Sequence, residues 1–457
     1  MEVTKRLAEF AVEMKYEKIP EDVIRQAKFA IADSMGAVIS GLEESTVEII
    51  RKVLVKDYGP GSATVLGCGM DLAAPGAALA NAAAAHALDN DNISLTVSGF
   101  VTSPIFFALL AVAEEEDGLS GRQLLEAFVA GYEVEAGIAR GLGVYHYANG
   151  WHSTSTLAHF GASVAVGKLL NLDVLQMRYV IGVAASEASG VRTMVGNMIN
   201  PFHVGKAARN GVAAARLVQN GFSAHESVLE TNWGFCNAFN GKGNYDLSAM
   251  LSGLGEPYDL VDPGLVIKVY PCCGLIHSGL DGVLDLKKEH GVFTEDLRRG
   301  QIAVHELVPK TMNFDHPENG YEAKFSIPFC VATAMREGSV KMSHFNDERV
   351  RESGMQQIMG CVETVVHPEL RGYETFLDKE FTDVTLELKD GRTLQTRVWR
   401  LNNRGSKGRP ITLEELKEKF LDCTGSRYGK EAAMGVFQKL AELEKVADIR
   451  EVTACLK

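Results

Sequence analysis

The stretch Ala74–His86, APGAALANAAAAH, does most to decide the fold of this 457-residue chain. Alanine favours helix, and its small side chain lets neighbouring helices approach closely. A second stretch of the same character, rich in Ala and Gly, occupies residues 161–170. Both lie within residues 1–265, where the pattern is mostly helical. The sequence therefore predicts a tightly packed helical bundle for this region.

Local signals mark the ends of several helices in this region. Pro20 predicts a helix that runs to about Ser40, and Ser120 is expected to cap the helix that follows it. Asn200 precedes a proline, which is typical of an N-cap residue with proline at the first helical position. Gly221 is the expected stop of that helix.

The character of the chain changes over residues 266–400. Helical patterns at about 274–290 and 321–337 alternate with β-like runs at 301–308 and 362–367. Alternation of this kind is typical of a smaller α/β domain.

A hairpin is the clearest strand signal. The runs 383–389 and 392–400 alternate in polarity and are separated by Asp390-Gly391, a pair that favours a tight hairpin turn. Farther on, Thr412 and Glu415 form a capping box that opens a helix. We expect this C-terminal tail to rejoin the helical bundle.

The predicted fold class is therefore mainly α. A large all-helical domain is expected from residues 1–265 and 401–457, with a smaller α/β (α+β) lid domain from residues 266–400.

Composition excludes several classes of protein. With 46 basic and 59 acidic residues, the net charge is −13, which argues against binding to nucleic acid or to an anionic membrane surface. No run of 18 apolar residues predicts a membrane-spanning helix, and the N-terminus lacks the pattern of a signal peptide. The eight cysteines are scattered. These features predict a reduced, cytoplasmic protein.

Motifs for bound cofactors are also missing from the sequence. Neither a GxGxxG nor a Walker pattern occurs at a strand–helix junction, and HExxH is absent. We therefore expect no nucleotide cofactor and no metal.

Two stretches of the helical region contain candidate catalytic residues. In HALDNDN (86–92), Asp89 and Asp91 follow the alanine-rich helix and could orient a base or transfer a proton; they could equally cap or turn the chain. In GWHSTST (150–156), His152 stands among hydroxyl residues at a helix start. It could meet an anion or have a purely structural role.

Cations gather around a third stretch. Arg192, Asn200, His203 and Lys206 surround one helix start, where backbone N–H groups and positive charge suit a carboxylate. His203 and Lys206 are three residues apart and are expected on one helical face. The alternative is a solvated basic face.

A fourth stretch, KVYPCCGLIHS (268–278), lies at the junction of the two predicted domains. Lys268, Cys272, Cys273 and His277 could supply acid, base and anion contacts there. A zinc site is not favoured because the spacing of structural zinc sites is not matched. The alternative is that the cysteines are small core residues.

These four stretches, in this order and over nearly the whole chain, resemble the MmgE/PrpD family. The resemblance is carried by HALDNDN (86–92), GWHSTSTLAHFGASVAVGKLL (150–170), ASEASGVR (185–192), NPFHVGKAARNG (200–211), KVYPCCGLIH (268–277) and EAKFSIPF (322–329).

The resemblance implies a fold and an activity. It implies a large helical domain made from both ends of the chain, a smaller α/β lid domain, a homodimer, and an active site between the domains. Family members include 2-methylcitrate dehydratase, cis-aconitate decarboxylase and iminodisuccinate epimerase. They act on small di- and tricarboxylates without metal or nucleotide.

Site residues follow from the resemblance position by position. Asp89 matches the family's active-site aspartate, His152 its histidine, although Ser153 replaces the usual proline, and Lys268 the lysine ahead of a proline-containing turn. Cys273 falls where the decarboxylase members place a histidine.

The sequence departs from the family pattern at two places. Family dehydratases and decarboxylases carry a histidine soon after the aspartate-rich segment, whereas residues 94–99 contain none. Asn200 stands where they carry a lysine before proline. Either the substrate has fewer carboxylates than the substrates of those members, or the reaction differs from theirs.

The leading hypothesis is a cofactor-independent lyase of the hydratase/dehydratase type. Removing a proton next to a carboxylate needs a base, a proton donor and fixed cations. By residue type, His152 is the best acid or base, Lys268 and Arg192 the best carboxylate partners, and Asp89 would orient His152 or shuttle a proton. The other candidate substrate contacts are Asn200, His203, Lys206 and Cys272.

Three alternatives remain open at this point. An isomerase of the epimerase type would use a second base, Cys273 or His277, opposite His152. A decarboxylase and a non-catalytic carboxylate-binding protein are the other two.

Overall fold

The computed structural model describes every residue except 1, 117, 195–196 and 373–378. The chain forms two compact units. Unit 1 comprises Met1–Ala87, Asp91–Ile267 and Thr412–Lys457, and unit 2 comprises Leu88–Asn90 and Lys268–Ile411. Helices dominate and the strands form small sheets, so the expected mainly α fold class is confirmed.

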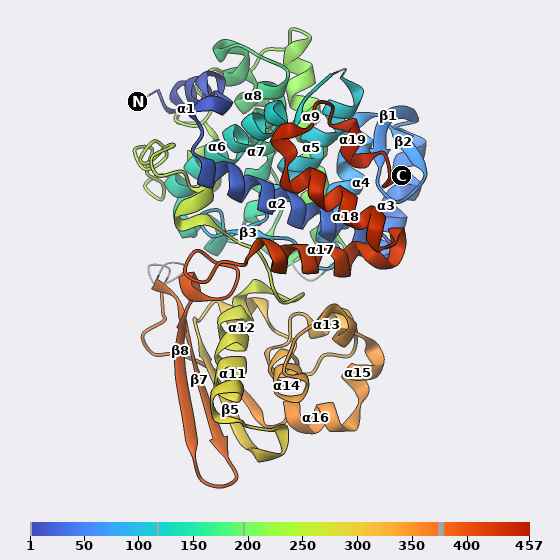
Figure 1. Ribbon diagram of the computed structural model, residues 1–457. Coiled ribbons are helices and arrows are strands. Elements are labelled where there is room, and N and C mark those ends of the chain that lie inside the picture. Colours follow the sequence, from blue (N-terminus) through green and yellow to red (C-terminus); the bar gives the residue numbers. More distant parts are fainter. Residues whose placement is uncertain (1, 117, 195–196, 373–378) are drawn as a thin grey trace. The chain divides into compact units, whose positions relative to one another are not determined.

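Unit 1 is a helical bundle with two short strand pairs, β1 with β2 and β3 with β4 (Figure 1). Its helices and strands are α1 (Val3–Glu13), α2 (Glu21–Ser40), α3 (Ser45–Asp57), β1 (Pro60–Val65), β2 (Met70–Leu72), α4 (Ala74–His86), β3 (Ile93–Ser94), α5 (Thr102–Glu115), α6 (Gly121–Ala148), α7 (Ser153–Leu169), α8 (Val174–Glu187), α9 (Ile199–Gln219), α10 (Phe235–Asn240), β4 (Leu265–Val266), α17 (Leu413–Tyr428), α18 (Lys430–Ala441) and α19 (Arg450–Thr453).

The alanine-rich helix α4 lies in the middle of this bundle. It packs against α9, α5 and α2, and all but one of its residues are buried. Small residues on α9 allow the close approach: a Cβ atom added to Gly205 would lie 2.5 Å from the carbonyl oxygen of Leu79. Helix α17, red in Figure 1, comes from the last part of the chain and packs against α2, in blue.

Most of the predicted helix ends are confirmed. Helix α2 ends at Ser40, and Ser120 and Thr412 each form a capping box at the start of α6 and α17. The N-cap assignment of Asn200 is wrong. Helix α9 begins at Ile199, two residues before the predicted first position, Pro201, and the Asn200 side chain is hydrogen-bonded to His86 and not to the helix start.

Unit 2 is built on a four-stranded sheet of order β6-β5-β7-β8, in which only β5 and β6 are parallel. Its elements are α11 (His277–His290), β5 (Leu297–Val304), α12 (Val308–Thr311), α13 (Gly320–Ala323), α14 (Ile327–Glu337), α15 (Asp347–Arg351), α16 (Ser353–Met359), β6 (Val362–Val366), β7 (Phe381–Leu388) and β8 (Thr393–Trp399).

The predicted hairpin is confirmed as β7 and β8, which pair in antiparallel register around the Asp390-Gly391 turn. Two predictions need correction. The strand expected at 301–308 is β5, which starts four residues earlier, at Leu297, and ends at Val304 because the chain turns at residues 306–307. The helix expected at 321–337 is two helices, because the side chain of Ser326 caps the second one.

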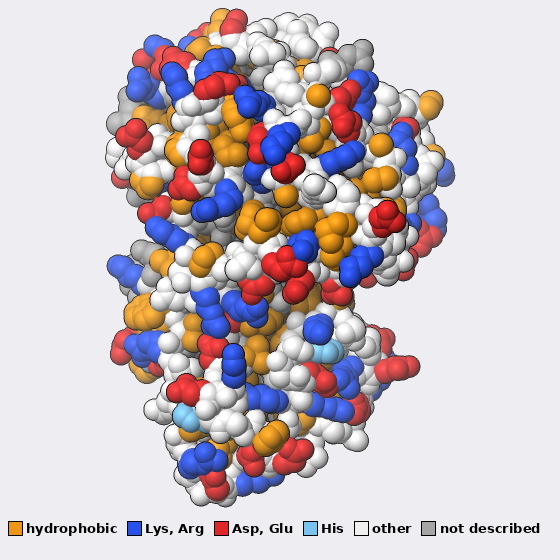
Figure 2. Space-filling view, in the orientation of Figure 1, with side chains coloured by type: hydrophobic (Ala, Val, Ile, Leu, Met, Phe, Trp, Pro, Cys, Tyr) orange, Lys and Arg blue, Asp and Glu red, His pale blue; other side chains and the backbone are white. Residues whose placement is uncertain are grey.

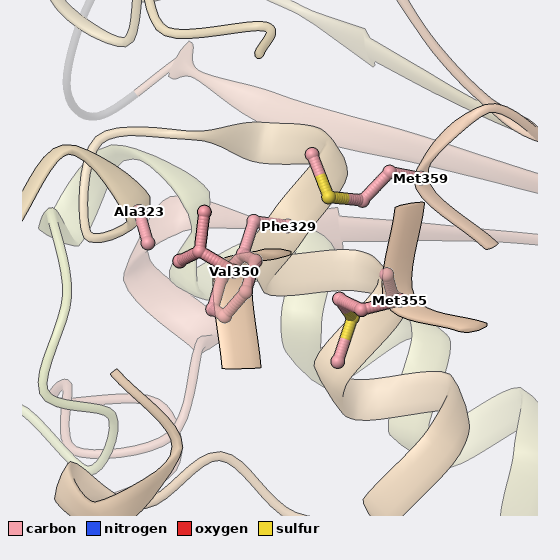
Figure 3. Close-up of a cluster of buried hydrophobic side chains, with 6 residues drawn as sticks. Ala323, Phe329, Val350, Met355 and Met359 are labelled. Atoms are coloured by element: carbon pink, nitrogen blue, oxygen red, sulfur yellow. The ribbon is translucent and has the colours of Figure 1, made fainter. Parts of the chain in front are cut away.

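Helix α11 packs against β7 and β8, and α14 packs against α11. Beyond α14, the short helices enclose a small apolar cluster (Figure 3). The cluster is made of Ala323, Phe329, Ala332, Val350, Met355 and Met359. It ties α13, α15 and α16 to α14, so the irregular part of unit 2 has a core of its own.

Figure 2 shows acidic and basic side chains interspersed over the visible face of the molecule. Among the described helices, none combines the length and the apolar character needed to cross a membrane.

The segment that precedes His152 is held by a buried polar and aromatic cluster. His146 of α6 is 1% exposed, and its two ring nitrogens contact Asn240 Oδ1 (2.8 Å) and Thr156 Oγ1 (2.7 Å). Its ring stacks on Trp151, whose indole N–H donates to the carbonyl oxygen of Phe239. These contacts fix the backbone immediately before His152.

Burial lowers the pKa of His146 to about 4. The unfolded chain then binds more protons than the folded one between pH 4 and about 6.5. The neutral His146 ring therefore contributes to the free energy of unfolding above pH 6.5, and this contribution is lost as the pH falls toward 4. The loss is on the order of 3 kcal/mol. We expect His146→Gln to lower the free energy of unfolding at pH 7. Between pH 6.5 and pH 4 the variant should lose about 3 kcal/mol less of this free energy than the wild type does, as measured by urea unfolding at both pH values. Equal losses of unfolding free energy in the variant and in the wild type would contradict this expectation.

Candidate active site

In unit 1, a histidine and a carboxylate meet at the end of α4. His86 Nδ1 lies 2.9 Å from Asp91 Oδ1, and Ser103 Oγ donates to Asp91 Oδ2 (3.1 Å). The other ring nitrogen, Nε2, lies 3.0 Å from Asn200 Nδ2, and the ring packs on Phe100. Both His86 and Asp91 are almost completely buried, so the pair lies in the interior of the bundle.

A second histidine pair brings α7 and α9 together. His152 is the N-cap residue of α7, but its side chain makes no capping bond. Its Nδ1 lies 3.0 Å from Nδ1 of His203, and its backbone N–H donates to the carbonyl oxygen of Gly190 (3.1 Å). Gly190 has φ 128°, and an added Cβ would lie 2.3 Å from Ser155 Oγ, so only glycine fits beside this pair.

Both histidines are held in the neutral form at neutral pH. Burial, followed by the charges of His203 and His86, lowers the pKa of His152 well below its usual value. Burial and Lys206 lower the pKa of His203 to about 4. Because one N–H joins the two Nδ1 atoms, the donor ring keeps an unprotonated Nε2 and the acceptor ring a protonated one. One pair therefore offers both a base and a proton donor.

Two cations lie near the histidine pair. Lys206, on the same face of α9 as His203, donates from Nζ to the carbonyl oxygen and hydroxyl of Ser189 (2.7 and 2.8 Å). Burial and Arg209 lower its pKa to about 8, and it stays largely protonated at pH 7. Arg192 lies 4.1 Å from the centre of the Tyr147 ring. Both positive charges disfavour a protonated His152, and both favour an anion beside it.

In unit 2, Lys268 forms a buried ion pair with Asp89. Lys268 Nζ lies 2.7 Å from Asp89 Oδ1 and 2.8 Å from its carbonyl oxygen, and Lys268 is 1% exposed. The Asp89 backbone is left-handed, with φ 53°, which is uncommon for a residue other than glycine. The lysine holds this conformation because it contacts both the backbone and the side chain.

The cysteines and His277 lie beside this pair. Cys273 is 8% exposed, and burial followed by Asp89 raises the pKa of its thiol to about 12. Burial and the neighbouring Cys330 raise the pKa of Cys272 well above its usual value. His277 begins α11, and its Nε2 lies 3.3 Å from the carbonyl oxygen of Cys272. Both thiols keep their protons at neutral pH.

The structure therefore groups the proposed site residues into two sets. Unit 1 brings together His152, His203, Lys206 and Asn200, with Arg192 near Tyr147; unit 2 brings together Lys268, Asp89, Cys272, Cys273 and His277. The roles assigned to these residues, including the orientation of His152 by Asp89, stay predictions.

Asp91 is a candidate from the sequence together with Asp89, but its pairing with His86 was not predicted. His86 and Asp91 stand in the quoted HALDNDN stretch, five residues apart, and one of them ends a helix. A histidine and an aspartate at such a spacing, across a helix end, are a signal that could have found the pair.

Comparisons with known proteins complete the description. The model of the MmgE/PrpD N-terminal domain matches residues 5–248, and that of the MmgE/PrpD C-terminal domain matches residues 270–443. Cis-aconitate decarboxylase of Aspergillus terreus is 27% identical over 368 residues, which cover 76% of this chain and 74% of that protein. The protein of the same name from Mus musculus is 23% identical, and the match covers 100% of this chain and 93% of that protein. The one from Homo sapiens is 24% identical, and the match covers 97% of this chain and 92% of that protein.

Proposed function

Because the chain belongs to the MmgE/PrpD family, we propose that it is a lyase that acts on a small di- or tricarboxylic acid by proton transfer at a carbon next to a carboxylate. The observation that carries the proposal is the buried, neutral pair of His152 and His203 with Lys206 and Arg192 nearby. A neutral imidazole can accept a proton from carbon, and the cations stabilise the negative charge that develops.

Addition or removal of water is the first candidate reaction. It needs a base for the C–H proton and an acid for the leaving hydroxyl, and the histidine pair supports both roles because its two outer nitrogens differ in protonation. In this scheme His152 is the base and His203 the proton donor. Lys206 and Arg192 bind carboxylate groups of the substrate.

Decarboxylation is the second candidate, and the names of the relatives favour it. Loss of CO₂ leaves a carbanion that needs a proton, so the same pair would act as the donor. A two-base isomerase with Cys273 as the second base is less well supported, because a Cys273 thiol with a pKa of about 12 keeps its proton at neutral pH, and His277 is the other candidate for that base.

A panel of di- and tricarboxylates, incubated with the enzyme and analysed by mass spectrometry, tests the proposal. Dehydration or hydration changes the product mass by one water, decarboxylation removes one CO₂, and epimerisation leaves the mass unchanged. We expect the mass of one compound of the panel to change by one water or, if none does so, by one CO₂. A panel in which no compound changes mass would contradict the proposal.

A further inference from the structure

One buried polar atom beside the histidine pair has no hydrogen-bond partner among the described residues. The atom is Oδ1 of Asn200, which is the second residue of α9 and is only 4% exposed. Leaving a buried acceptor without a partner is unfavourable, so such an atom needs an explanation such as a bound water, an ion or a ligand group.

The hydrogen-bond network fixes which way the Asn200 amide faces. Nδ2 of Asn200 lies 3.0 Å from His86 Nε2, and an amide NH₂ group can only donate, so Nε2 of the ring is the acceptor. The ring proton of His86 is then on Nδ1, which lies 2.9 Å from Asp91 Oδ1. The amide oxygen is consequently the atom left over.

The position of Asn200 on α9 relates this oxygen to the proposed chemistry. Asn200 and His203 are three residues apart and lie on the same face of the first turns of α9, and His203 contacts His152 through Nδ1. A ligand group that reaches Asn200 Oδ1 therefore binds next to the pair that we propose to transfer the proton. An amide oxygen accepts hydrogen bonds only, so it selects an O–H or N–H group and gains nothing from a carboxylate.

We propose that Asn200 Oδ1 accepts a hydrogen bond from a hydroxyl or amino group of the substrate, so that the site selects carboxylates that carry such a donor. This inference rests on the proposed function and narrows its substrate class to hydroxy- or amino-substituted di- and tricarboxylates. The hydroxyl keeps its lone pairs when it donates to Asn200, so it can still receive a proton as it leaves.

Binding of matched ligand pairs to the full chain tests the inference. Malate and succinate differ only in one hydroxyl group, as do citrate and tricarballylate, and aspartate replaces the hydroxyl of malate with an amino group. We expect isothermal titration to show at least one hydroxy or amino compound binding about tenfold or more tightly than its unsubstituted partner. Both members of a hydroxy pair carry the same number of carboxylates, so the ratio isolates the donor group.

Variants separate the acceptor from the rest of the site. Asn200→Leu keeps the volume but removes the oxygen, and the ratio is expected to fall to about one. Circular dichroism spectra that match between Asn200→Leu and the wild type guard against a result caused by misfolding. Asn210→Leu is the matched control: Asn210 is another α9 asparagine whose amide nitrogen contacts a histidine, His159, at 3.1 Å, and the ratio should not change.

The outcomes are distinct from those of the proposed function. Equal binding within every pair by the wild type, no binding of any pair, or an unchanged ratio in Asn200→Leu overturns the inference; an ordered water would then be the natural partner of Oδ1. If the wild type discriminates as expected but converts no compound, the lyase proposal fails and the inference stands. If it converts only carboxylates without a donor group, the inference fails and the lyase proposal stands.

Discussion

Replacing His152 with glutamine is expected to lower turnover of the identified substrate by about 10²- to 10⁴-fold, the usual effect of losing a general acid or base. The reason lies in the electrostatics of unit 1. Burial and His203 lower the pKa of His152, so the ring is neutral and able to accept a proton at pH 7. Glutamine can keep a hydrogen bond to His203 but cannot accept the proton.

The matched control for this variant is His159→Gln. His159 lies on the same helix, is also fully buried, and contacts Asn210 instead of the histidine pair. It should lower stability without a comparable loss of turnover per folded molecule. Initial rates, normalised to the folded fraction from circular dichroism, provide the comparison. Full activity in the His152 variant would exclude this residue as the base.

Replacing Lys268 with methionine is expected to destabilise unit 2 by about 3–5 kcal/mol, since it leaves the buried Asp89 carboxylate without its cation. It also removes the hydrogen bond to the Asp89 carbonyl oxygen, which supports a left-handed backbone. Native-state hydrogen exchange of the β5 and β7 amides measures the opening free energy of unit 2.

The double variant Lys268→Met/Asp89→Asn is the control for the Lys268 experiment. It also removes the negative charge of Asp89 and should recover much of the lost stability, whereas activity should stay low in both proteins if Lys268 binds a substrate carboxylate. A single variant as stable as the wild type would show that the ion pair does not hold this part of unit 2. Recovery of activity in the double variant would contradict the substrate-binding role of Lys268.

The parts of the fold that the sequence predicted well depend on neighbouring residues. The capping box at Ser120 needs only Gln123, and the hairpin needs only the Asp390-Gly391 pair between alternating runs. Interactions of this kind are complete within a few residues, so local pattern is sufficient to locate them.

Local sequence patterns were insufficient where a distant partner decides the contacts of a side chain. Asn200 has the sequence of an N-cap residue, but its side chain is hydrogen-bonded to His86, 114 residues away. His152 contacts His203 over 51 residues, and Lys268 contacts Asp89 over 179 residues. No local pattern specifies such pairs, so the sequence could propose these residues as candidates but not the partners that set their protonation.

The most direct test of the proposed proton transfer is turnover in D₂O, with the product examined by NMR and mass spectrometry. For the active carboxylate, run in the direction that forms a C–H bond, the wild type is expected to place one solvent deuteron on carbon, and His152→Gln is expected to do so at least about 100-fold more slowly. Turnover at the wild-type rate without deuterium at that carbon, or with equal incorporation by the His152 variant, would contradict the account.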